Sequence, residues 1–235
     1  MKTLIIIPAY NEAENIERVV EELMQYGYDY VVINDGSADN TAQICRERGY
    51  RLIDMPVNVG LTGVVQTGMK YAYKHGYDSA VQLDGDGQHD PQYLTSMIAY
   101  MQQHNMDIVI GSRFVEEKKP KTLRMLGSNL IQVAIRLTTG MMLSDPTSGL
   151  RLYNRQMLKL FSNDFNMTPE PDTISYLIRN GAKVSEIQVE MRERIAGESY
   201  LNFTRSIQYM LRMVISILLI QWFRTKKKIT EGVTV

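Results

Sequence analysis

The 235-residue sequence has a single cysteine, Cys45, and no excess of either charge. One cysteine excludes an internal disulfide framework and a zinc site built from cysteines. The 26 basic and 26 acidic residues cancel, which argues against a nucleic-acid-binding protein, since such proteins need a basic surface. No run of about 18 predominantly apolar residues occurs, so we expect no ordinary membrane-spanning helix. Met1 to Ala9 is too short for a secretory signal, which favours a cytoplasmic location.

Three common nucleotide and hydrolase motifs are also missing. The spaced pair Gly60-x-x-Gly63 is not the G-x-G-x-x-G of nicotinamide-binding proteins, and it follows the third predicted strand, not the first. The chain has no P-loop and no G-x-S-x-G motif, so a P-loop nucleotidase and a serine hydrolase are excluded. A composition of 44% hydrophobic and 22% charged residues is typical of a packed globular protein.

Apolar runs and helical patterns alternate along the first half of the chain. The runs predict buried strands at 3–8, 30–34, 51–55, 80–83 and 108–111, with helices at 11–26, 39–49, 63–76 and 90–105 between them. This alternation predicts an α/β fold with a mostly parallel, doubly wound sheet. The second half predicts helices at 125–139, 173–180 and 201–224, and short strands within 144–153 and 183–189. We expect one catalytic domain over 1–200, divided into a nucleotide-binding half (1–111) and an acceptor half (112–200).

An acidic motif follows the fourth predicted strand: Asp84-Gly85-Asp86-Gly87-Gln88. Parallel sheets place their ligand sites at the carboxyl ends of strands. Two carboxylates and an amide oxygen are hard ligands that suit Mg²⁺ or Mn²⁺ rather than zinc. The motif predicts a metal that neutralises a leaving diphosphate. Its alternative interpretation is a plain Asp/Gly turn.

Two further polar turns follow the first and second predicted strands. The first reads Pro8-Ala9-Tyr10-Asn11-Glu12 and the second Asn34-Asp35-Gly36-Ser37. Tyr10 is suited to stack on a base, and Glu12 and Asp35 to accept hydrogen bonds from a nucleoside. Each turn alone also fits an ordinary strand–helix connection. Three polar turns at one edge of the sheet favour a nucleotide site.

Basic residues occur where an anionic substrate would need them. Arg113 follows the fifth predicted strand, Arg124 and Ser128 lie one helical turn apart, and Arg194 precedes Gly197-Glu198-Ser199. Arginine can bind two phosphate oxygens at once. A surface ion pair is the usual role of any one arginine, but the positions beside turn motifs favour phosphate binding here.

The motifs PAYNE, NDGS, DGDGQHDP, GSR, DPTSGLRLY and RxxGES occur in this order from residue 8 to 199. This series resembles the polyprenyl-phosphate glycosyltransferases related to dolichyl-phosphate mannose synthase, which are inverting, metal-dependent enzymes of family 2 with the Rossmann-like GT-A fold. The resemblance implies transfer of a sugar from a nucleotide-diphosphate sugar (GDP or UDP) to a polyprenyl phosphate. One departure is Asn34, where the family usually has aspartate.

The resemblance also implies roles for individual residues. The nucleotide would be held by Pro8, Ala9, Tyr10, Glu12, Asp35, Asp84, Gly85 and Arg194. Asp86 and Gln88 would hold Mg²⁺ or Mn²⁺. Arg113, Arg124 and Ser128 would bind the acceptor phosphate, and Asp84, Asp86, Arg113 and Arg124 would carry the catalytic step.

Two alternative functions remain open from the sequence. The first is transfer to a sugar hydroxyl, which needs a base; Glu170 or Asp172 are candidates, although their flanking prolines also fit a helix start. The second is a non-catalytic nucleotide-sugar-binding subunit of a membrane complex, which the intact Asp86 and Gln88 disfavour.

The C-terminal region differs in charge from the rest of the chain. Residues 201–235 hold six basic residues and one acid, Glu231. We expect an amphipathic helix at 201–224 whose polar stripe is Arg205, Gln208, Arg212 and Ser216. Two interpretations of residues 201–228 are compatible: peripheral binding to an anionic membrane surface, or packing on the core or on a second subunit in a homodimer.

Overall fold

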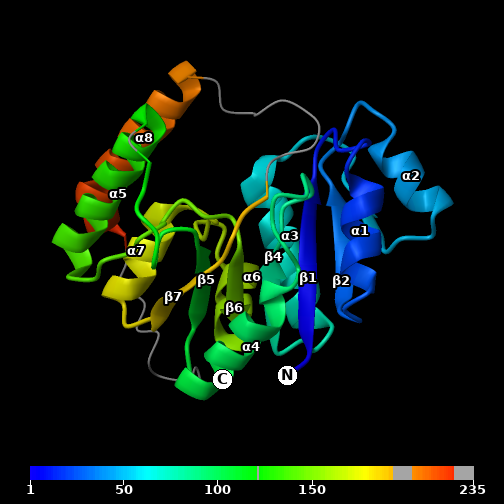
Figure 1. The fold of residues 1–235 in the computed structure, drawn as a ribbon, viewed down its shortest axis with the longest axis horizontal. Coiled ribbons are helices and arrows are strands. Elements are labelled where there is room, and N and C mark those ends of the chain that lie inside the picture. Colours follow the sequence, from blue (N-terminus) through cyan, green and yellow to red (C-terminus); the bar gives the residue numbers. More distant parts are fainter. Residues whose placement is uncertain (121, 193–202, 225–235) are drawn as a thin grey trace.

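The computed structural model describes residues 1–120, 122–192 and 203–224 (Figure 1). In this part of the chain one seven-stranded sheet runs in the order β3-β2-β1-β4-β6-β5-β7. Every neighbouring pair is parallel except those of β6, which is antiparallel to β4 and β5. The predicted mostly parallel sheet is confirmed. Its strands are β1 (Thr3–Ala9), β2 (Asp29–Asn34), β3 (Leu52–Asp54), β4 (Ser79–Gln82), β5 (Ile108–Ser112), β6 (Arg151–Asn154) and β7 (Val184–Gln188).

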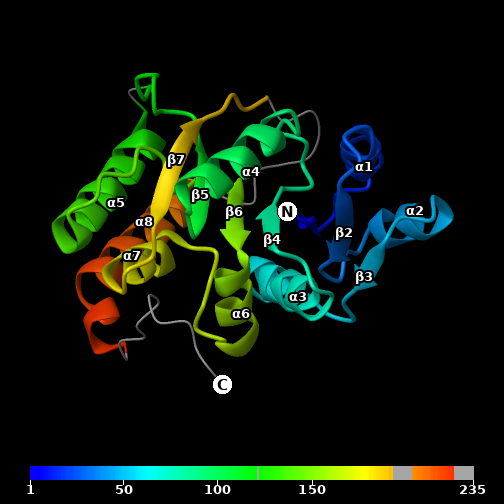
Figure 2. The ribbon, with the colours of Figure 1, turned by 90° about the horizontal axis from the view of Figure 1, so that it is seen from below.

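Helices cover both faces of the sheet (Figure 2). One face packs against α1 (Ile16–Met24), α2 (Thr41–Glu47) and α4 (Tyr93–His104). The other packs against α3 (Gly60–Lys74), α5 (Leu123–Thr139), α6 (Arg155–Asn163), α7 (Pro171–Arg179) and α8 (Phe203–Leu218). Along β1, Leu4 and Ile6 face the second layer while Ile5 and Ile7 face the first. Burial on both faces explains why this strand is a continuous apolar run.

The register of the parallel strands brings the predicted motifs to one edge. Ala9 at the end of β1 pairs with Asn34 at the end of β2, and the Leu83 N–H beyond β4 donates to the Ile6 carbonyl oxygen at 3.0 Å. The three polar turns therefore leave neighbouring strands at the same carboxyl edge, where α/β sheets bind their ligands.

Helix α6 is an element that the sequence analysis did not predict. The Asn154 side chain caps it by accepting a hydrogen bond from the Met157 N–H at 3.0 Å. Met157, Leu158 and Phe161 form its buried side. An asparagine followed by this apolar spacing is an ordinary helix-start signal.

The prediction of one continuous helix over 201–224 is wrong. Helix α8 ends at Leu218, and a short 3₁₀ helix, η1 (Ile220–Phe223), follows. Ser216 and Gln221 both donate to Asp172. Residues five apart lie about 140° apart around a straight α-helix, so a break after α8 lets both side chains reach one carboxylate.

The predicted polar stripe of this helix is also wrong in part. Ser216 is buried, while Gln208 and Arg212 are exposed; the fourth member, Arg205, lies outside the side chains that the structure describes. Met213 and Ile217 belong to the same core as α5 and α7, so α8 packs on the rest of the chain. Within the described residues, no helix combines the length and apolar character needed to cross a bilayer.

Candidate active site

The turns after β1 and β2 are joined by a set of hydrogen bonds. The Asn11 N–H donates to Ser37 Oγ at 2.9 Å, and the Ala38 N–H donates back to Asn11 Oδ1 at 2.9 Å. The Glu12 N–H donates to Thr41 Oγ1 at 2.9 Å. The two turns therefore form one rigid surface, although they are about 25 residues apart in the chain.

Asp35 lies at the centre of this surface and is almost fully buried. Its carboxylate accepts the N–H groups of Val59 at 2.7 Å and Gly60 at 3.0 Å, where α3 begins. A carboxylate at a helix N-terminus satisfies backbone donors and interacts favourably with the helix dipole. Tyr10, by contrast, has an exposed ring on the same turn, as base stacking would require.

Asn34, the departure from the expected aspartate, has a local explanation. Its Nδ2 donates to Asp54 Oδ1 at 2.7 Å, and its Oδ1 accepts a hydrogen bond from Ser37 Oγ. A carboxylate at position 34 would face the Asp54 carboxylate and repel it. The Asn34 amide can donate to Asp54 where a carboxylate could not. Its hydrogen bonds to Asp54 and Ser37 hold the turn after β2 in place.

The loop after β4 carries the acidic motif and is held from two sides. The Asp84 N–H donates to His89 Nδ1 at 3.1 Å, which holds the start of the loop against this buried ring. The Gln88 N–H donates to Asp86 Oδ1 at 3.1 Å, and the Arg192 N–H donates to the Gln88 carbonyl oxygen at 2.9 Å. Arg192 also forms an ion pair with Asp90 at 2.6 Å. The loop is thus fixed before any ligand binds.

Gly85 brings this loop against β1. A side-chain carbon at Gly85 would lie 2.7 Å from the Pro8 carbonyl oxygen, closer than ordinary packing allows. Pro8 and Ala9 are the last residues of β1, paired with Ile33 and Asn34. The acidic loop and the nucleotide turns are therefore direct neighbours.

The donor set of this loop fits a divalent metal of the Mg²⁺ or Mn²⁺ type. Gln88 donates its Nε2 toward the Arg192 carbonyl oxygen at 3.5 Å, and its Oε1 is a hard oxygen two residues along the loop from the Asp86 carboxylate. The described residues contain no group of three or more His, Cys, Asp or Glu side chains arranged to hold a metal. Mg²⁺ commonly uses one or two carboxylates and completes its shell with substrate phosphates and water, so these residues suit a metal bound together with a diphosphate.

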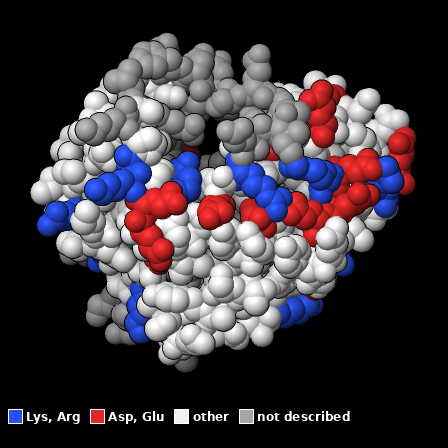
Figure 3. Space-filling model, in the orientation of Figure 1, with Lys and Arg blue, Asp and Glu red and all other residues white. Residues whose placement is uncertain are grey.

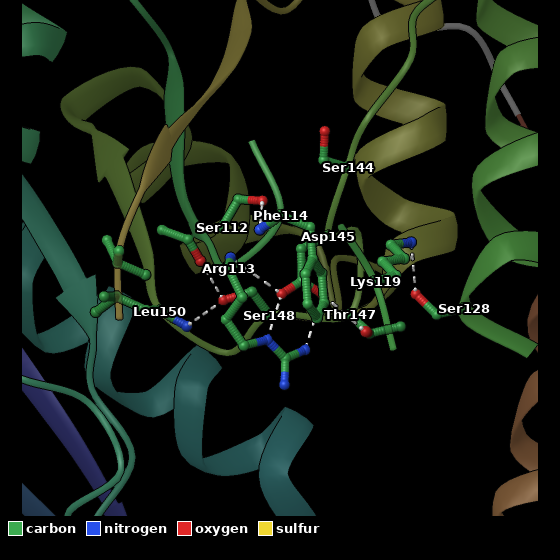
Figure 4. A network of polar contacts seen from close by, with 12 residues as sticks. Ser112, Arg113, Phe114, Lys119, Ser128, Ser144, Asp145, Thr147, Ser148 and Leu150 are labelled. Carbon is green, nitrogen blue, oxygen red and sulfur yellow. Dashed lines mark hydrogen bonds and ion pairs between the residues drawn. The ribbon is translucent and has the colours of Figure 1, made fainter. Parts of the chain in front are cut away.

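The loop 145–149 joins the acidic loop to the second half of the site. A side-chain carbon at Gly149 would lie 2.5 Å from Asp84 Oδ2. At the other end of the loop, Arg113 binds Asp145 through two hydrogen bonds, Nε to Oδ2 at 2.6 Å and Nη2 to Oδ1 at 3.0 Å. Asp145 is fully buried. Arg113 therefore holds this loop with two of its nitrogens, in addition to any role toward substrate (Figure 4).

Lys119 lies near Arg113, and the sequence did not indicate it as a site residue. Its Nζ donates to Ser128 Oγ of α5 at 3.2 Å (Figure 4). It also donates to Gln132 Oε1 of the same helix at 3.3 Å. Burial lowers the pKa of Lys119, although the nearby Asp145 and Glu186 raise it. The sequence feature that could have indicated Lys119 is the basic run Lys118-Lys119-Pro120-Lys121 immediately before a helix. Ser128, predicted as an acceptor ligand, is thus brought next to a cation.

The remaining predicted residues are placed as follows. The side chain of Arg124 and the whole of Arg194 lie outside what the structure describes. Tyr209 Oη donates to Glu170, and Ser216 Oγ donates to Asp172 at 2.6 Å. Both candidate bases therefore hold the C-terminal helix. Burial raises the pKa of Glu170.

The basic and acidic side chains visible in Figure 3 lie in one band across the face shown, where the two signs of charge alternate.

Gly149→Ala is expected to lower turnover about 10²-fold with little loss of stability, because the new methyl group displaces Asp84 and small misplacements at a reacting centre are costly. Gly68→Ala is the matched control. Its methyl group crowds Ile6 in the core, so it should lower the melting temperature but keep the turnover of the folded protein. Steady-state kinetics and thermal unfolding of both variants check this; equal turnover for Gly149→Ala and the parent would refute it.

The sequence is similar to those of known proteins. The chain is 33% identical over 179 residues to a UDP-N-acetylglucosamine–dolichyl-phosphate N-acetylglucosaminyltransferase of Methanococcus voltae, covering 67% of this chain and 71% of the relative. It is 28% identical over 216 residues to an undecaprenyl-phosphate mannosyltransferase of Micrococcus luteus, covering 86% and 88%.

Among solved structures, the fold matches glucosyl-3-phosphoglycerate synthase from Mycobacterium tuberculosis in complex with Mn²⁺, UDP and phosphoglyceric acid. The TM-score is 0.69 at 18% identity, over 95% of this chain and 79% of that one. This likeness confirms the predicted GT-A fold class. The model of the family described as "Glycosyl transferase family 2" matches residues 4–161. The chain belongs to glycosyltransferase family 2.

Proposed function

We propose that this protein transfers a sugar, with inversion, from a nucleotide-diphosphate sugar to a polyprenyl phosphate. The names of its relatives support the acceptor class, since they include transferases to dolichyl and undecaprenyl phosphate. UDP or GDP is the expected nucleotide, and UDP is present in the Mycobacterium tuberculosis structure of the same fold.

The observation that carries the proposal is that Arg113 and Lys119 lie together, beside carboxylates that already accept hydrogen bonds from the protein. Two cations and the Ser128 hydroxyl gather there. The neighbouring Asp145 binds Arg113, and Glu186 accepts hydrogen bonds from the N–H groups of Ser144 and Asp145. Burial raises the pKa of Glu186, and these backbone hydrogen bonds lower it. These carboxylates are occupied as structural acceptors, whereas the cations suit an anionic nucleophile.

A phosphate acceptor explains why no base is required at this place. Its oxygen is already negatively charged at neutral pH and can attack the anomeric carbon in line with the departing diphosphate. Arg113 and Lys119 would orient the acceptor, while Tyr10, Glu12 and Asp35 would hold the nucleoside. A divalent metal held by Asp86 and Gln88 would supply charge neutralisation of the leaving diphosphate. Catalysis would then rest on positioning and electrostatics.

Transfer to a hydroxyl group is the second candidate. It is considered because the Mycobacterium tuberculosis structure of the same fold contains phosphoglyceric acid, a molecule with a hydroxyl group. It requires a base within hydrogen-bond reach of the acceptor, and the sequence candidates are Glu170 and Asp172. Their engagement with Tyr209, Ser216 and Gln221 favours a structural role instead.

Glu170→Gln and Asp172→Asn are therefore expected to retain most of the transfer rate, because the amides preserve the shape of the site and can still accept hydrogen bonds from α8. Initial rates at saturating substrates are the measurement. A large fall in the transfer rate of either variant, with its melting temperature unchanged, would contradict the phosphate mechanism and support transfer to a hydroxyl group.

Lys119→Met is expected to raise the KM for the lipid phosphate by about tenfold or more, because one charge-assisted contact is lost. The KM for the nucleotide sugar should stay unchanged. Lys118→Met provides the matched control, since Lys118 is the exposed neighbour in the same loop. An equal effect of both substitutions would mean that only the general charge of the loop matters.

Thermal unfolding with nucleotide diphosphates tests the donor half separately. A ligand at a hundredfold excess over its Kd stabilises the native state by about 2.7 kcal/mol, which raises the melting temperature by roughly 5–10 °C in a chain of this size. We expect this shift with UDP or GDP only when Mg²⁺ or Mn²⁺ is present. No shift with any nucleotide diphosphate would contradict the proposed donor.

A further inference from the structure

Helix α5 has an apolar stripe that faces away from the protein. Leu126, Leu130, Val133 and Leu137 recur at helical spacing and are 52% to 74% exposed. The opposite side of the helix buries Ile131, Ala134 and Ile135 in the core. A surface helix normally turns its single apolar stripe inward and shows polar residues to solvent. This helix is apolar on both sides.

Helix α8 has the same property. Ile207, Leu211, Ile215 and Leu218 are 36% to 56% exposed, while Met213 and Ile217 are buried. The following turn adds Trp222 and Phe223, which are 60% and 91% exposed. Exposed apolar patches of this extent mark interaction surfaces.

The two helices are held side by side with these stripes outward. A side-chain carbon at Gly127 of α5 would overlap the Met210 side chain of α8, so the backbones approach closely. Polar side chains of the C-terminal segment point to the protein: Tyr209 donates to Glu170, and Ser216 and Gln221 donate to Asp172. These hydrogen bonds fix the rotation of α8 and leave its apolar side exposed among the residues that the structure describes.

The sequence around both helices contains only one sign of charge. Residues 118–144 hold five basic residues and residues 199–230 hold six, and neither stretch contains any of the 26 acidic residues. Exposed Arg136 lies on α5 and exposed Arg212 on α8. Neither helix therefore carries a carboxylate of its own, and both carry an exposed arginine.

We propose that the outward faces of α5, α8 and η1 form a docking surface for an anionic lipid bilayer. The apolar stripes would enter the interface, and the exposed Arg136 and Arg212 would bind headgroup phosphates. Trp222, whose ring lies 4.0 Å from the Arg179 guanidinium, suits the headgroup level. A second copy of the chain is a poorer occupant, because a symmetric dimer would bring these cations against their own counterparts.

The surface also explains how the acceptor site reaches its lipid. Ser128, which contacts Lys119, lies in the second turn of α5, so the cation cluster lies beside the first turns of the helix that carries the docking stripe. A lipid phosphate at the bilayer surface would then reach Lys119 without leaving the headgroup layer. This part of the inference rests on the proposed function; bilayer binding itself does not.

Flotation of the full chain with vesicles tests the inference. The vesicles contain phosphatidylcholine with or without phosphatidylglycerol, and no polyprenyl phosphate. We expect binding to the anionic vesicles at low salt and weaker binding at high salt. The double substitution Leu137→Glu/Leu211→Glu should reduce partitioning roughly tenfold or more, because it removes two apolar side chains from the interface. Met24→Glu on α1 is the matched control, an exposed methionine on the other layer.

The outcomes separate the inference from the proposed function. Failure of the parent protein to float with anionic vesicles, or equal flotation of the double variant, would overturn the docking surface. A dimer in analytical ultracentrifugation that the double variant dissociates, without flotation, would assign the face to a second copy and overturn it too. Flotation without transferase activity would support the surface and contradict the proposed function. The double variant should transfer sugar to a short, water-soluble polyprenyl phosphate as fast as the parent does.

Discussion

Replacing Asp86 by alanine should reduce turnover by ~10²-fold or more, the usual cost of removing an electrostatic group that acts on developing charge. The diphosphate carries its negative charge away from the sugar, and Asp86 is the buried carboxylate on the loop that would hold the compensating metal. The fold should survive, because the loop is kept in place by contacts of its neighbours. The His89 ring, the Gln88 carbonyl and Arg192 all lie outside the altered side chain.

Two measurements check this expectation. Initial rates give the loss of turnover, and thermal unfolding with UDP and Mn²⁺ gives metal-dependent binding without any need for activity. Asp86→Ala should lose the metal-dependent part of the stabilisation and keep the melting temperature of the free protein. Glu14→Ala, at an exposed position of the neighbouring turn, is the control. A folded Asp86→Ala protein with a near-normal rate would show that Asp86 does not hold a metal needed for transfer.

Arg151→Met should lower the free energy of unfolding by about 3 kcal/mol, because it leaves buried backbone acceptors without donors. Arg151 is almost fully buried, and its three guanidinium nitrogens donate to the carbonyl oxygens of Ser148, Pro146 and Pro169 at 2.8, 2.7 and 2.8 Å. Methionine avoids the cost of burying a charge. This gain offsets part of the loss, so we expect a net change of about 3 kcal/mol. The melting temperature should fall by roughly 6–12 °C.

The same substitution should also lower turnover, because Arg151 braces the loop 145–149 that lies between Asp84 and Arg113. Chemical denaturation gives the stability and initial rates give the activity. Arg155→Met is the matched control: this exposed arginine donates to the Tyr77 carbonyl oxygen and lies over the Tyr73 ring, and the loss of these surface contacts should cost about 1 kcal/mol. Equal stability of the two variants would show that the buried hydrogen bonds contribute little.

The sheet and the donor side of the site could be predicted from local patterns. Strands buried on both faces are continuous apolar runs, as β1 is, and ligand residues in parallel sheets follow strands directly. For that reason the turns at Tyr10, Asp35 and Asp84 could be recognised without knowledge of tertiary contacts. Gly85 was expected among the nucleotide-binding residues, and its lack of a side chain permits the close approach of the Pro8 carbonyl oxygen.

The acceptor side was less predictable because its groups are positioned by long-range contacts. The pairing of Arg113 with Asp145 spans 32 residues, and the role of Lys119 depends on where α5 begins. Arg151 appeared in the sequence beside a turn motif, but its burial and three carbonyl partners give it a structural role. None of these properties follows from spacing along the chain.

The C-terminal helix shows a different limit. Its spacing predicts an amphipathic helix, but a pattern does not tell which side faces the protein. Here hydrogen bonds from Ser216 and Gln221 to Asp172 turn polar groups inward, and Leu211 and Ile215 remain outside. The same bonds end α8 at Leu218. Both features depend on a carboxylate about 44 residues earlier in the chain.

The most direct test of the central claim is mass spectrometry of the product formed with competing acceptors. The purified chain is incubated with a nucleotide-diphosphate sugar, Mn²⁺, and an equimolar mixture of a polyprenyl phosphate, the corresponding polyprenol and phosphoglyceric acid. We predict that only the polyprenyl phosphate gains the mass of one sugar residue, with the released nucleotide diphosphate in equal amount. Transfer to the polyprenol or to phosphoglyceric acid, with the polyprenyl phosphate unchanged, would contradict the account.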